Sequence, residues 1–287
     1  MPKVTFIGAG SAVFARKLMT DILAVEGLDE GEFALCDLDA ARLDLARRIA
    51  ERLIALTGKR WRVTASTERR DVLAGSDFIV NSIEVAGLAN VRHDYDIPLG
   101  YGVDQCIGDT IGPGGIFKAL RTGPAWLAIL RDAERLCPDA WVLNYTNPMS
   151  ILTLAALTAT RMRTVGLCHS VQNTSRELAD YLGVPHGELE FTCGGINHNA
   201  WFTALRHDGE DLYPRLRARR RHGGLRARPR ALRHDAPFRG LCDREQRALL
   251  RVRTLLSQAA RPDRQILPRG LPGRERLLRQ QLAPLAR

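Results

Sequence analysis

Two motifs in the second half of the sequence place metal-binding residue types where predicted strands end. Cys168 and His169 follow the predicted strand in RTVGLCHS, and His198 lies thirty positions after Cys168 in the glycine-rich stretch GINHNAW. A thiolate and an imidazole are good ligands for a borderline divalent cation. A site with only two protein ligands leaves room for substrate oxygens and water, which suits catalysis. A buried cysteine beside a core histidine is the competing interpretation.

A glycine-rich turn near the N-terminus has the pattern of a dinucleotide site. GAGSAVF follows the predicted strand KVTFI and opens a predicted helix, so Gly8 can make the tight turn and Gly10 can let the backbone approach a pyrophosphate. We expect Gly8, Gly10 and Ser11 to contact the cofactor, and Asp37, near the end of the second strand, to accept the ribose hydroxyls of NAD. Because Val13 replaces the third glycine of the usual motif, a plain strand–turn–helix remains the alternative.

Two more stretches carry candidate ligand contacts. DTIGPGGIFKALRT is rich in glycine and predicts a loop that a ligand approaches closely, with Asp109 holding a hydroxyl or a metal-bound water and Arg121 a phosphate or carboxylate. LNYTNPM ends a predicted strand, and strand carboxyl ends bind ligands in open α/β sheets. Asn144 could face the nicotinamide and Asn147 the substrate. Plain turns that bond local backbone are the alternative for both stretches.

The elements that must position these residues alternate between strands and helices. Strand-like runs include KVTFI, FALCDLD, WRVTAST and SDFIVNSI, and the amphipathic run AARLDLARRIAERLIALTG predicts a helix ending at Gly58. This alternation predicts an α/β fold with a Rossmann-like, doubly wound parallel sheet. We assign residues 1–165 to this NAD-binding domain and 166–214 to the start of an α+β catalytic, metal-binding domain.

The positive charge of the chain is concentrated in its last quarter. The 287 residues carry a net charge of +10, but from Leu212 to Arg287 there are 21 arginines, no lysine and five acidic residues, whereas residues 1–211 hold 21 basic and 27 acidic residues. A basic tail that binds nucleic acid is one interpretation. The absence of lysine argues against it, and we expect no evolved nucleic-acid partner.

The sequence shows neither a secretory signal nor an apolar run of about 20 residues, the length that a membrane span needs. Its six cysteines lack the clustered spacing of a disulfide framework. We therefore expect a cytoplasmic protein that does not bind a membrane.

Five motifs, taken in order, resemble family 4 of the glycoside hydrolases over residues 1–214. They are KVTFIGAGS, DTIGPGGIFKALRT, NYTNPM, GLCHSVQ and GINHNAWF. The CHSV form resembles the α-galactosidase branch, with α-glucosidases and α-galacturonidases as close relatives. The resemblance implies a fold like that of lactate and malate dehydrogenases, NAD and Mn²⁺ or another divalent cation as cofactors, a sugar substrate, and homo-oligomers for intact members.

The family implies hydrolysis by transient redox chemistry, an exception to the paired-carboxylate mechanism. NAD oxidises the C3 hydroxyl, the C2 proton becomes acidic while Mn²⁺ stabilises the enediolate, the glycosidic oxygen leaves, and NADH returns the hydride after water adds. By matching motif, Cys168 and His198 resemble the Mn²⁺ ligands and Asn147 a substrate-binding Asn. His169 stands where some relatives have an Asp acid, so His169 and Asp109 are our candidate catalytic residues.

A dehydrogenase of the lactate/malate type, acting on a small hydroxy acid with NAD, is the alternative function. It shares the predicted fold and an Asn-Pro turn. The sequence alone leaves the sugar, its anomer and its phosphorylation open.

The arginine-rich residues 215–287 depart from the family pattern. Family members continue past the LYP at 212–214 with a segment resembling FVTESSEHFAEY, which this chain lacks. In the next codon phase, with free choice at degenerate positions, Leu241 to Arg253 can spell FATESSEHFSEYV and RPDRQI can spell DLIDR. We therefore hypothesise a frameshift between Pro214 and about Arg230, which would make 215–287 a disordered, out-of-frame tail. Such a chain would be truncated within its catalytic domain and inactive or poorly folded.

Resequencing the gene tests this hypothesis. We expect an in-phase alternative near Pro214 that continues the family's motifs. An unbroken reading frame with no such alternative nearby would refute the frameshift.

Overall fold

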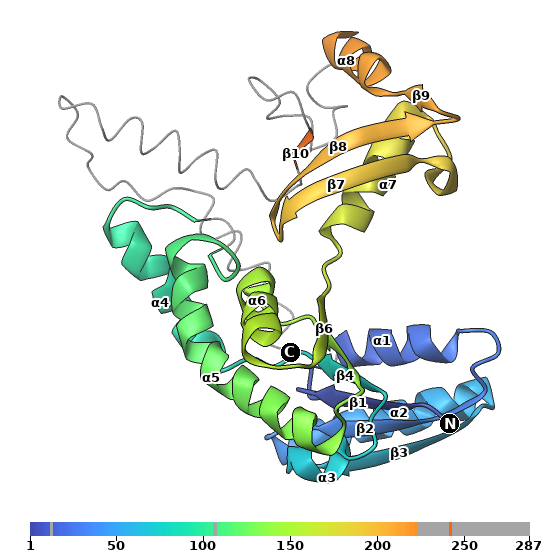
Figure 1. Ribbon diagram of the computed structural model, residues 1–287, viewed down its shortest axis with the longest axis vertical. Coiled ribbons are helices and arrows are strands. Elements are labelled where there is room, and N and C mark those ends of the chain that lie inside the picture. The colour runs from blue at the N-terminus through green and yellow to red at the C-terminus, as the bar shows by residue number, and fades with distance from the viewer. Residues whose placement is uncertain (12–13, 106–107, 223–240, 243–287) are drawn as a thin grey trace. The chain divides into compact units, whose positions relative to one another are not determined.

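The computed structural model describes residues 1–11, 14–105, 108–222 and 241–242, and its first sheet is parallel throughout (Figure 1). The strand order is β3-β2-β1-β4-β5-β6. The strands are β1 (Lys3–Ile7), β2 (Glu30–Cys36), β3 (Arg60–Ser66), β4 (Phe78–Asn81), β5 (Trp141–Asn144) and β6 (Arg163–Gly166). Strand order reverses direction between β1 and β4, which is where doubly wound sheets bind ligands. The predicted fold class is confirmed.

Helices cover both faces of this sheet. They are α1 (Phe14–Leu23), α2 (Ala40–Thr57), α3 (Arg69–Leu73), α5 (Gly112–Leu136) and α6 (Met149–Ala159), whereas α4 (Gly87–Gly100) packs on α5. Alternate strand residues point to opposite faces, so Phe6 packs with α1 and α2, whereas its neighbour Ile7 packs with α3, α5 and α6. Two separate hydrophobic clusters result, one on each face of the sheet.

The helix α5 begins earlier than the sequence pattern predicts. DTIGPGGIFKALRT predicts a ligand-binding loop, but the structure starts α5 at Gly112 and carries it through this stretch. The glycines serve packing here. A side chain on Gly114 would overlap the backbone oxygens of Gly108 and Asp94, so glycine lets α5 pack directly on the preceding loop. The predicted loop is therefore limited to the residues before Gly112.

A second, antiparallel sheet follows helix α7 (Ser170–Leu182) and the short helix η1 (His186–Glu188). It consists of a hairpin of β7 (Glu190–Ile196) and β8 (Asn199–His207), with β9 (Glu210–Asp211) and β10 (Leu241–Cys242) paired to β8. Leu178 and Leu182 of α7 pack against Phe202 and Leu205 of β8 in a third hydrophobic cluster. The strands predicted around a glycine-rich bend are confirmed.

The structure continues in regular form past the expected boundary at residue 214. Helix α8 spans Tyr213–His222, and its Leu216 is buried in the third cluster, while Arg215 Nη2 donates to the Leu182 carbonyl at 2.6 Å. The expectation that the chain is disordered from residue 215 onward is therefore wrong for residues 215–222, which lie in α8. Residues 223–240 and 243–287, on which the rest of that prediction falls, lie outside the described part of the chain.

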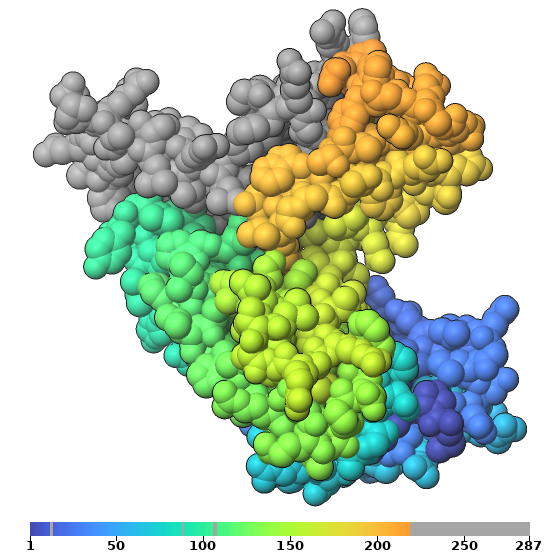
Figure 2. Space-filling view, in the orientation of Figure 1, coloured from blue at the N-terminus to red at the C-terminus, as the bar shows by residue number. Residues whose placement is uncertain are grey.

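Helix α6 is apolar on most of its surface, and it lies beside α5 (Figure 2). Its Leu152 and Ala156 are buried in the core, and the Trp126 indole donates to the Leu152 carbonyl at 2.9 Å. Leu154 and Leu157 on the same helix are exposed. Within the described ranges, no helix is long and apolar enough to cross a membrane.

A buried carboxylate joins α3 to α5. Asp132 of α5 is buried and pairs with Arg69 Nη2 at 2.6 Å and with Arg70 Nε at 3.3 Å, both from α3, and with Arg135. Burial raises the pKa of Asp132, but the hydrogen bonds and charges of Arg69 and Arg70 outweigh burial and hold the pKa below its ordinary value. The ionised carboxylate therefore stabilises the folded state.

Replacing Asp132 by Asn should lower the free energy of unfolding at pH 7 by about 1–3 kcal/mol, because charge-assisted hydrogen bonds are lost. A lowered folded-state pKa gives stability that is present above the unfolded pKa and lost as pH falls through the folded pKa. The difference from the unchanged chain should therefore shrink below about pH 4. Urea unfolding across pH measures it.

The matched control is Asp44→Asn on α2, where the carboxylate pairs with Arg47 and Arg48 on the surface. Exposed pairs contribute little, so this change should be smaller. Equal losses in both variants, or a loss for Asp132→Asn that does not vary with pH, would contradict the structural role.

Candidate active site at the carboxyl edge of the parallel sheet

The glycine turn after β1 and the acid after β2 lie in direct contact. The Gly10 backbone N–H donates to Asp37 Oδ2 at 2.7 Å. Gly8 has a φ of 85°, in the left-handed region, and a Cβ there would lie 2.7 Å from the Ser82 carbonyl oxygen. Only glycine fits between the ends of β1 and β4. The structure thus brings the predicted pyrophosphate turn and ribose acid together beside the reversal of strand order.

The start of α1 extends this edge toward β5 and β6. Ser11 accepts the Ala15 N–H through its carbonyl, while residues 12–13 lie outside the described part. The Phe14 ring contacts the rings of Tyr145 and His169 edge-on, with centroids 5.0 and 5.8 Å apart. His169 is exposed. Its imidazole is thus accessible at the edge where the dinucleotide turn ends.

Asn147 and Asp109 meet through a hydrogen bond. Asn147 follows β5, and its Nδ2 donates to Asp109 Oδ2 at 3.2 Å. The Lys118 ammonium of α5, itself buried, lies 3.7 Å from Asp109 Oδ2 and 2.8 Å from Glu84 Oε2. Loops after β4 and β5 and the loop before α5 are therefore tied by charge and hydrogen bonding. The Asp109 carboxylate is held between the Lys118 ammonium and the Asn147 amide.

The two predicted metal ligands converge although they come from different sheets. Cys168 Sγ lies 3.8 Å from His198 Nε2. A cation bound tetrahedrally by a thiolate and an imidazole separates the two donor atoms by about 3.6 Å, so the observed separation is compatible with one shared ion. In the described residues, no group of three or more His, Cys, Asp or Glu could hold a metal.

His198 is held in an uncommon backbone conformation. It lies in the turn between β7 and β8 with a φ of 61°, which few residues other than glycine adopt. The preceding residue is anchored, because the Asn197 N–H donates to Ser150 Oγ of α6 at 2.9 Å. Burial lowers the pKa of His198, and the nearby charge of Asp109 partly opposes that shift. A neutral imidazole is the form that binds a metal.

Comparison with known proteins identifies the family to which this site belongs. A family model described as "Family 4 glycosyl hydrolase" matches residues 3–184. The chain belongs to family 4 of the glycosyl hydrolases. The model of the family 4 C-terminal domain also matches, over residues 193–251, which includes part of the arginine-rich segment.

The similarity to individual proteins agrees with this family. The chain is 43% identical to an alpha-galactosidase from Bacillus subtilis over 220 residues, which cover 76% of this chain and 51% of that protein. A 6-phospho-alpha-glucosidase from gut microorganisms, solved with NAD and Mn²⁺, has a TM-score of 0.74 at 20% identity and covers 90% of this chain, with 70% of that structure matched. Lactate dehydrogenase from Eimeria maxima, with NADH and oxamate, has a TM-score of 0.55 at 15% identity over 76% of this chain and 60% of its own. The chain spans about half the length of the curated relatives that it matches.

Two predicted site residues have protein partners in the structure. Asn144, predicted to face the nicotinamide, is completely buried, and its amide bonds Asn81 and Thr146. Arg121, predicted to hold a phosphate or carboxylate, places both terminal nitrogens on Asp94, at 3.1 and 2.6 Å. Asp94 is buried and a buried carboxylate requires a partner, which explains the pairing.

Sequence reasoning missed Lys118, Glu84 and Asn197 in this family 4 site. Lys118 is one of only four lysines and lies inside a quoted motif, but its partners come from segments 9 and 34 residues away. Asn197 lies inside GINHNAW, and both its side-chain polar atoms are buried without a hydrogen-bond partner among the described residues. The residue types were visible in the sequence, whereas their burial was not.

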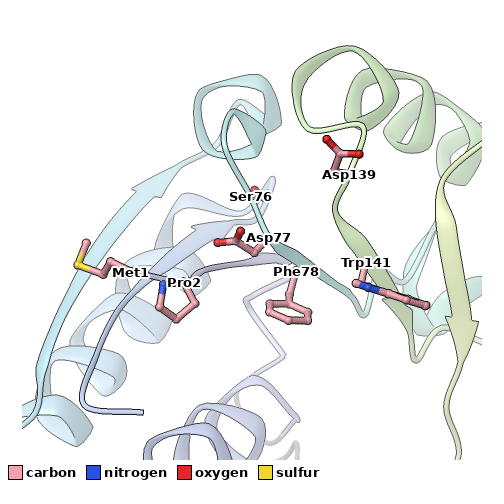
Figure 3. A pocket seen from close by; sticks show the side chains of 7 residues that line it. All are labelled: Met1, Pro2, Ser76, Asp77, Phe78, Asp139 and Trp141. Carbon is pink, nitrogen blue, oxygen red and sulfur yellow. The ribbon is translucent and has the colours of Figure 1, made fainter. Parts of the chain in front are cut away.

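A hollow of about 410 Å³ lies at the opposite edge of the sheet, between the N-terminus and the starts of β4 and β5 (Figure 3). Asp77, Phe78 and Trp141 line it, and none of the residues discussed above does. Parallel sheets bind ligands at their carboxyl ends, so we assign the chemistry to the other edge despite this hollow.

If Cys168 is a metal ligand, Cys168→Ser should weaken Mn²⁺ binding by more than tenfold in the presence of NAD, since changes to outer-shell partners alone cost about 10–100-fold. Electron paramagnetic resonance of free Mn²⁺ measures the affinity. Cys193→Ser, a partly buried cysteine on β7, is the control and should bind Mn²⁺ like the unchanged chain. Equal affinities for all three proteins would exclude Cys168 as a ligand.

Proposed function

We propose that the protein hydrolyses α-glycosidic bonds with NAD and a divalent cation, and that unphosphorylated α-galactosides are its substrates. The convergence of Cys168 Sγ and His198 Nε2 within 3.8 Å, at the edge that holds the Gly10–Asp37 contact, is the observation that carries the proposal. Family membership supports the same chemistry.

The residues divide the binding work between cofactor, cation and sugar. Backbone groups of Gly8, Gly10 and Ser11 hold the pyrophosphate, and Asp37 accepts the ribose hydroxyls. Cys168 and His198 hold the cation. The bound nicotinamide takes a hydride from C3 of the sugar and later returns it, while the cation stabilises negative charge on the sugar oxygens.

The chain's own side chains orient the sugar and move protons. Asn147 and Asp109 are hydrogen-bonded to each other and present an amide and a carboxylate for sugar hydroxyls. The exposed His169 imidazole donates a proton to the glycosidic oxygen as it leaves. The Phe14 ring contacts the ring of this histidine and also packs against the ring of Tyr145.

The choice of an α-galactoside rests on similarity. The 43% identity to an alpha-galactosidase and the CHSV form after β6 both support it. The solved relative with NAD and Mn²⁺ supports these two cofactors. The cytoplasmic location, the homo-oligomeric state and the lack of a nucleic-acid partner remain predictions.

The experiment supplies p-nitrophenyl α-galactoside in D₂O with Mn²⁺, a reductant and less NAD than substrate, to the purified chain and to the frame-corrected gene product. We expect the corrected product to release p-nitrophenol without accumulating NADH and to form galactose labelled with deuterium at C2, because a C2 proton exchanges with solvent. Mass spectrometry measures the label.

Net NADH production from a hydroxy acid, without glycoside cleavage, would contradict the proposal and favour the dehydrogenase alternative. Hydrolysis by the unchanged chain would show that the expectation of an inactive polypeptide is wrong. Cys168→Ser in the corrected product is the control and should abolish p-nitrophenol release.

A further inference from the structure

Two asparagines stand opposite each other at the carboxyl ends of neighbouring strands. Asn81 ends β4 and Asn144 ends β5, and the two are register partners. Both are completely buried, whereas the residues before them, Val80 and Leu143, are apolar. Burying a carboxamide costs free energy unless it is hydrogen-bonded, so a specific arrangement must offset this cost.

Hydrogen bonds connect the two asparagines with Thr146 in the loop that follows. Asn81 Nδ2 donates to Asn144 Oδ1 at 2.9 Å and to Thr146 Oγ1 at 3.1 Å. The Thr146 N–H donates to Asn144 Oδ1 at 3.1 Å, and Asn144 Nδ2 donates to the Thr146 carbonyl at 3.3 Å. Thr146 Oγ1 in turn donates to the Ile83 carbonyl at 3.2 Å. The loops after β4 and β5 are therefore fixed to each other.

The network ends at the residues that we assign to substrate and cation. Thr146 precedes Asn147, whose amide binds Asp109. The Asn144 carbonyl accepts the Leu167 N–H at 3.0 Å, and Leu167 precedes Cys168. Buried side chains therefore fix the loop on which Asn147 stands, and a backbone hydrogen bond of Asn144 fixes the segment that leads to Cys168.

We propose that Asn81, Asn144 and Thr146 are positioning residues that act through Asn147 and Cys168 on cation and sugar binding. This inference rests on the proposed function. Outer partners of metal ligands typically change metal affinity by about 10–100-fold when removed. An apolar strand end would pack equally well but would leave the two loops without fixed geometry.

A second buried polar pair in the same sheet provides the matched control. Thr5 Oγ1 lies 2.6 Å from Ser76 Oγ, and both residues are buried. Ser76 precedes β4, so this pair joins β1 to the amino end of a neighbouring strand. It belongs to the same class of interaction and has no link to the proposed site.

The experiment compares Thr146→Val, Thr146→Ser and Thr5→Val in the full chain. Valine has the shape of threonine without its hydroxyl, whereas serine keeps the hydroxyl. We expect Thr146→Val to weaken Mn²⁺ binding in the presence of NAD at least tenfold, Thr146→Ser to stay within about twofold, and Thr5→Val to bind like the unchanged chain. Isothermal titration measures binding, and urea unfolding shows that each variant is folded.

The outcomes separate the two proposals. If the unchanged chain binds Mn²⁺ and NAD but a folded Thr146→Val binds equally well, the positioning role is overturned while the proposed function stands. If Thr5→Val weakens binding as much as Thr146→Val, the effect is one of general stability and the positioning role is also overturned. If the unchanged chain binds neither ligand, the positioning role is overturned for this chain, whereas glycoside hydrolysis by the frame-corrected product decides the proposed function separately.

Discussion

The contact between the Cys168 thiol and the His198 imidazole joins a loop of the parallel sheet to a turn of the antiparallel one. Local structure places each of the two residues. Cys168 follows the end of β6, and His198 lies in a hairpin turn whose backbone is in an uncommon conformation. The Ser150 hydroxyl holds that turn to the first turn of α6. A cation held by both residues would require the two sheets to keep this relation, and the family 4 match covers both sheets.

Periodicity in the sequence was sufficient to predict the parallel sheet, because strands buried on both faces alternate with amphipathic helices. The same patterns placed Gly8, Asp37, Asn147 and Cys168 at strand ends, where the structure has them. Sequence patterns failed for α5, because a glycine-rich stretch that allows close helix packing has the same composition as one that lets a ligand approach the backbone. They also failed at α8, whose Leu216 is buried by a sheet that local sequence cannot reveal.

The hydrogen-bond and ion-pair partners of polar side chains indicate roles that residue type alone left open. Arg121 and Asn144 have the chemistry of ligand contacts, but each is satisfied by a partner distant in sequence, Asp94 for the first and Asn81 for the second. Lys118 had no assigned role and yet neutralises Asp109 inside the site. A polar residue near a strand end can contact the ligand or support the residue that does, and only the three-dimensional contacts distinguish the two.

The hydrogen bond from the Gly10 N–H to Asp37 has a consequence for how a dinucleotide would enter. The turn and the acid already hold each other at 2.7 Å, so little chain entropy remains to be lost when a nucleotide arrives. In the function that we propose, the same carboxylate oxygen would accept a ribose hydroxyl as well as the backbone N–H. Discrimination against a 2′-phosphate would then be a property of the protein before any nucleotide binds, since the carboxylate that would repel it is already held in place.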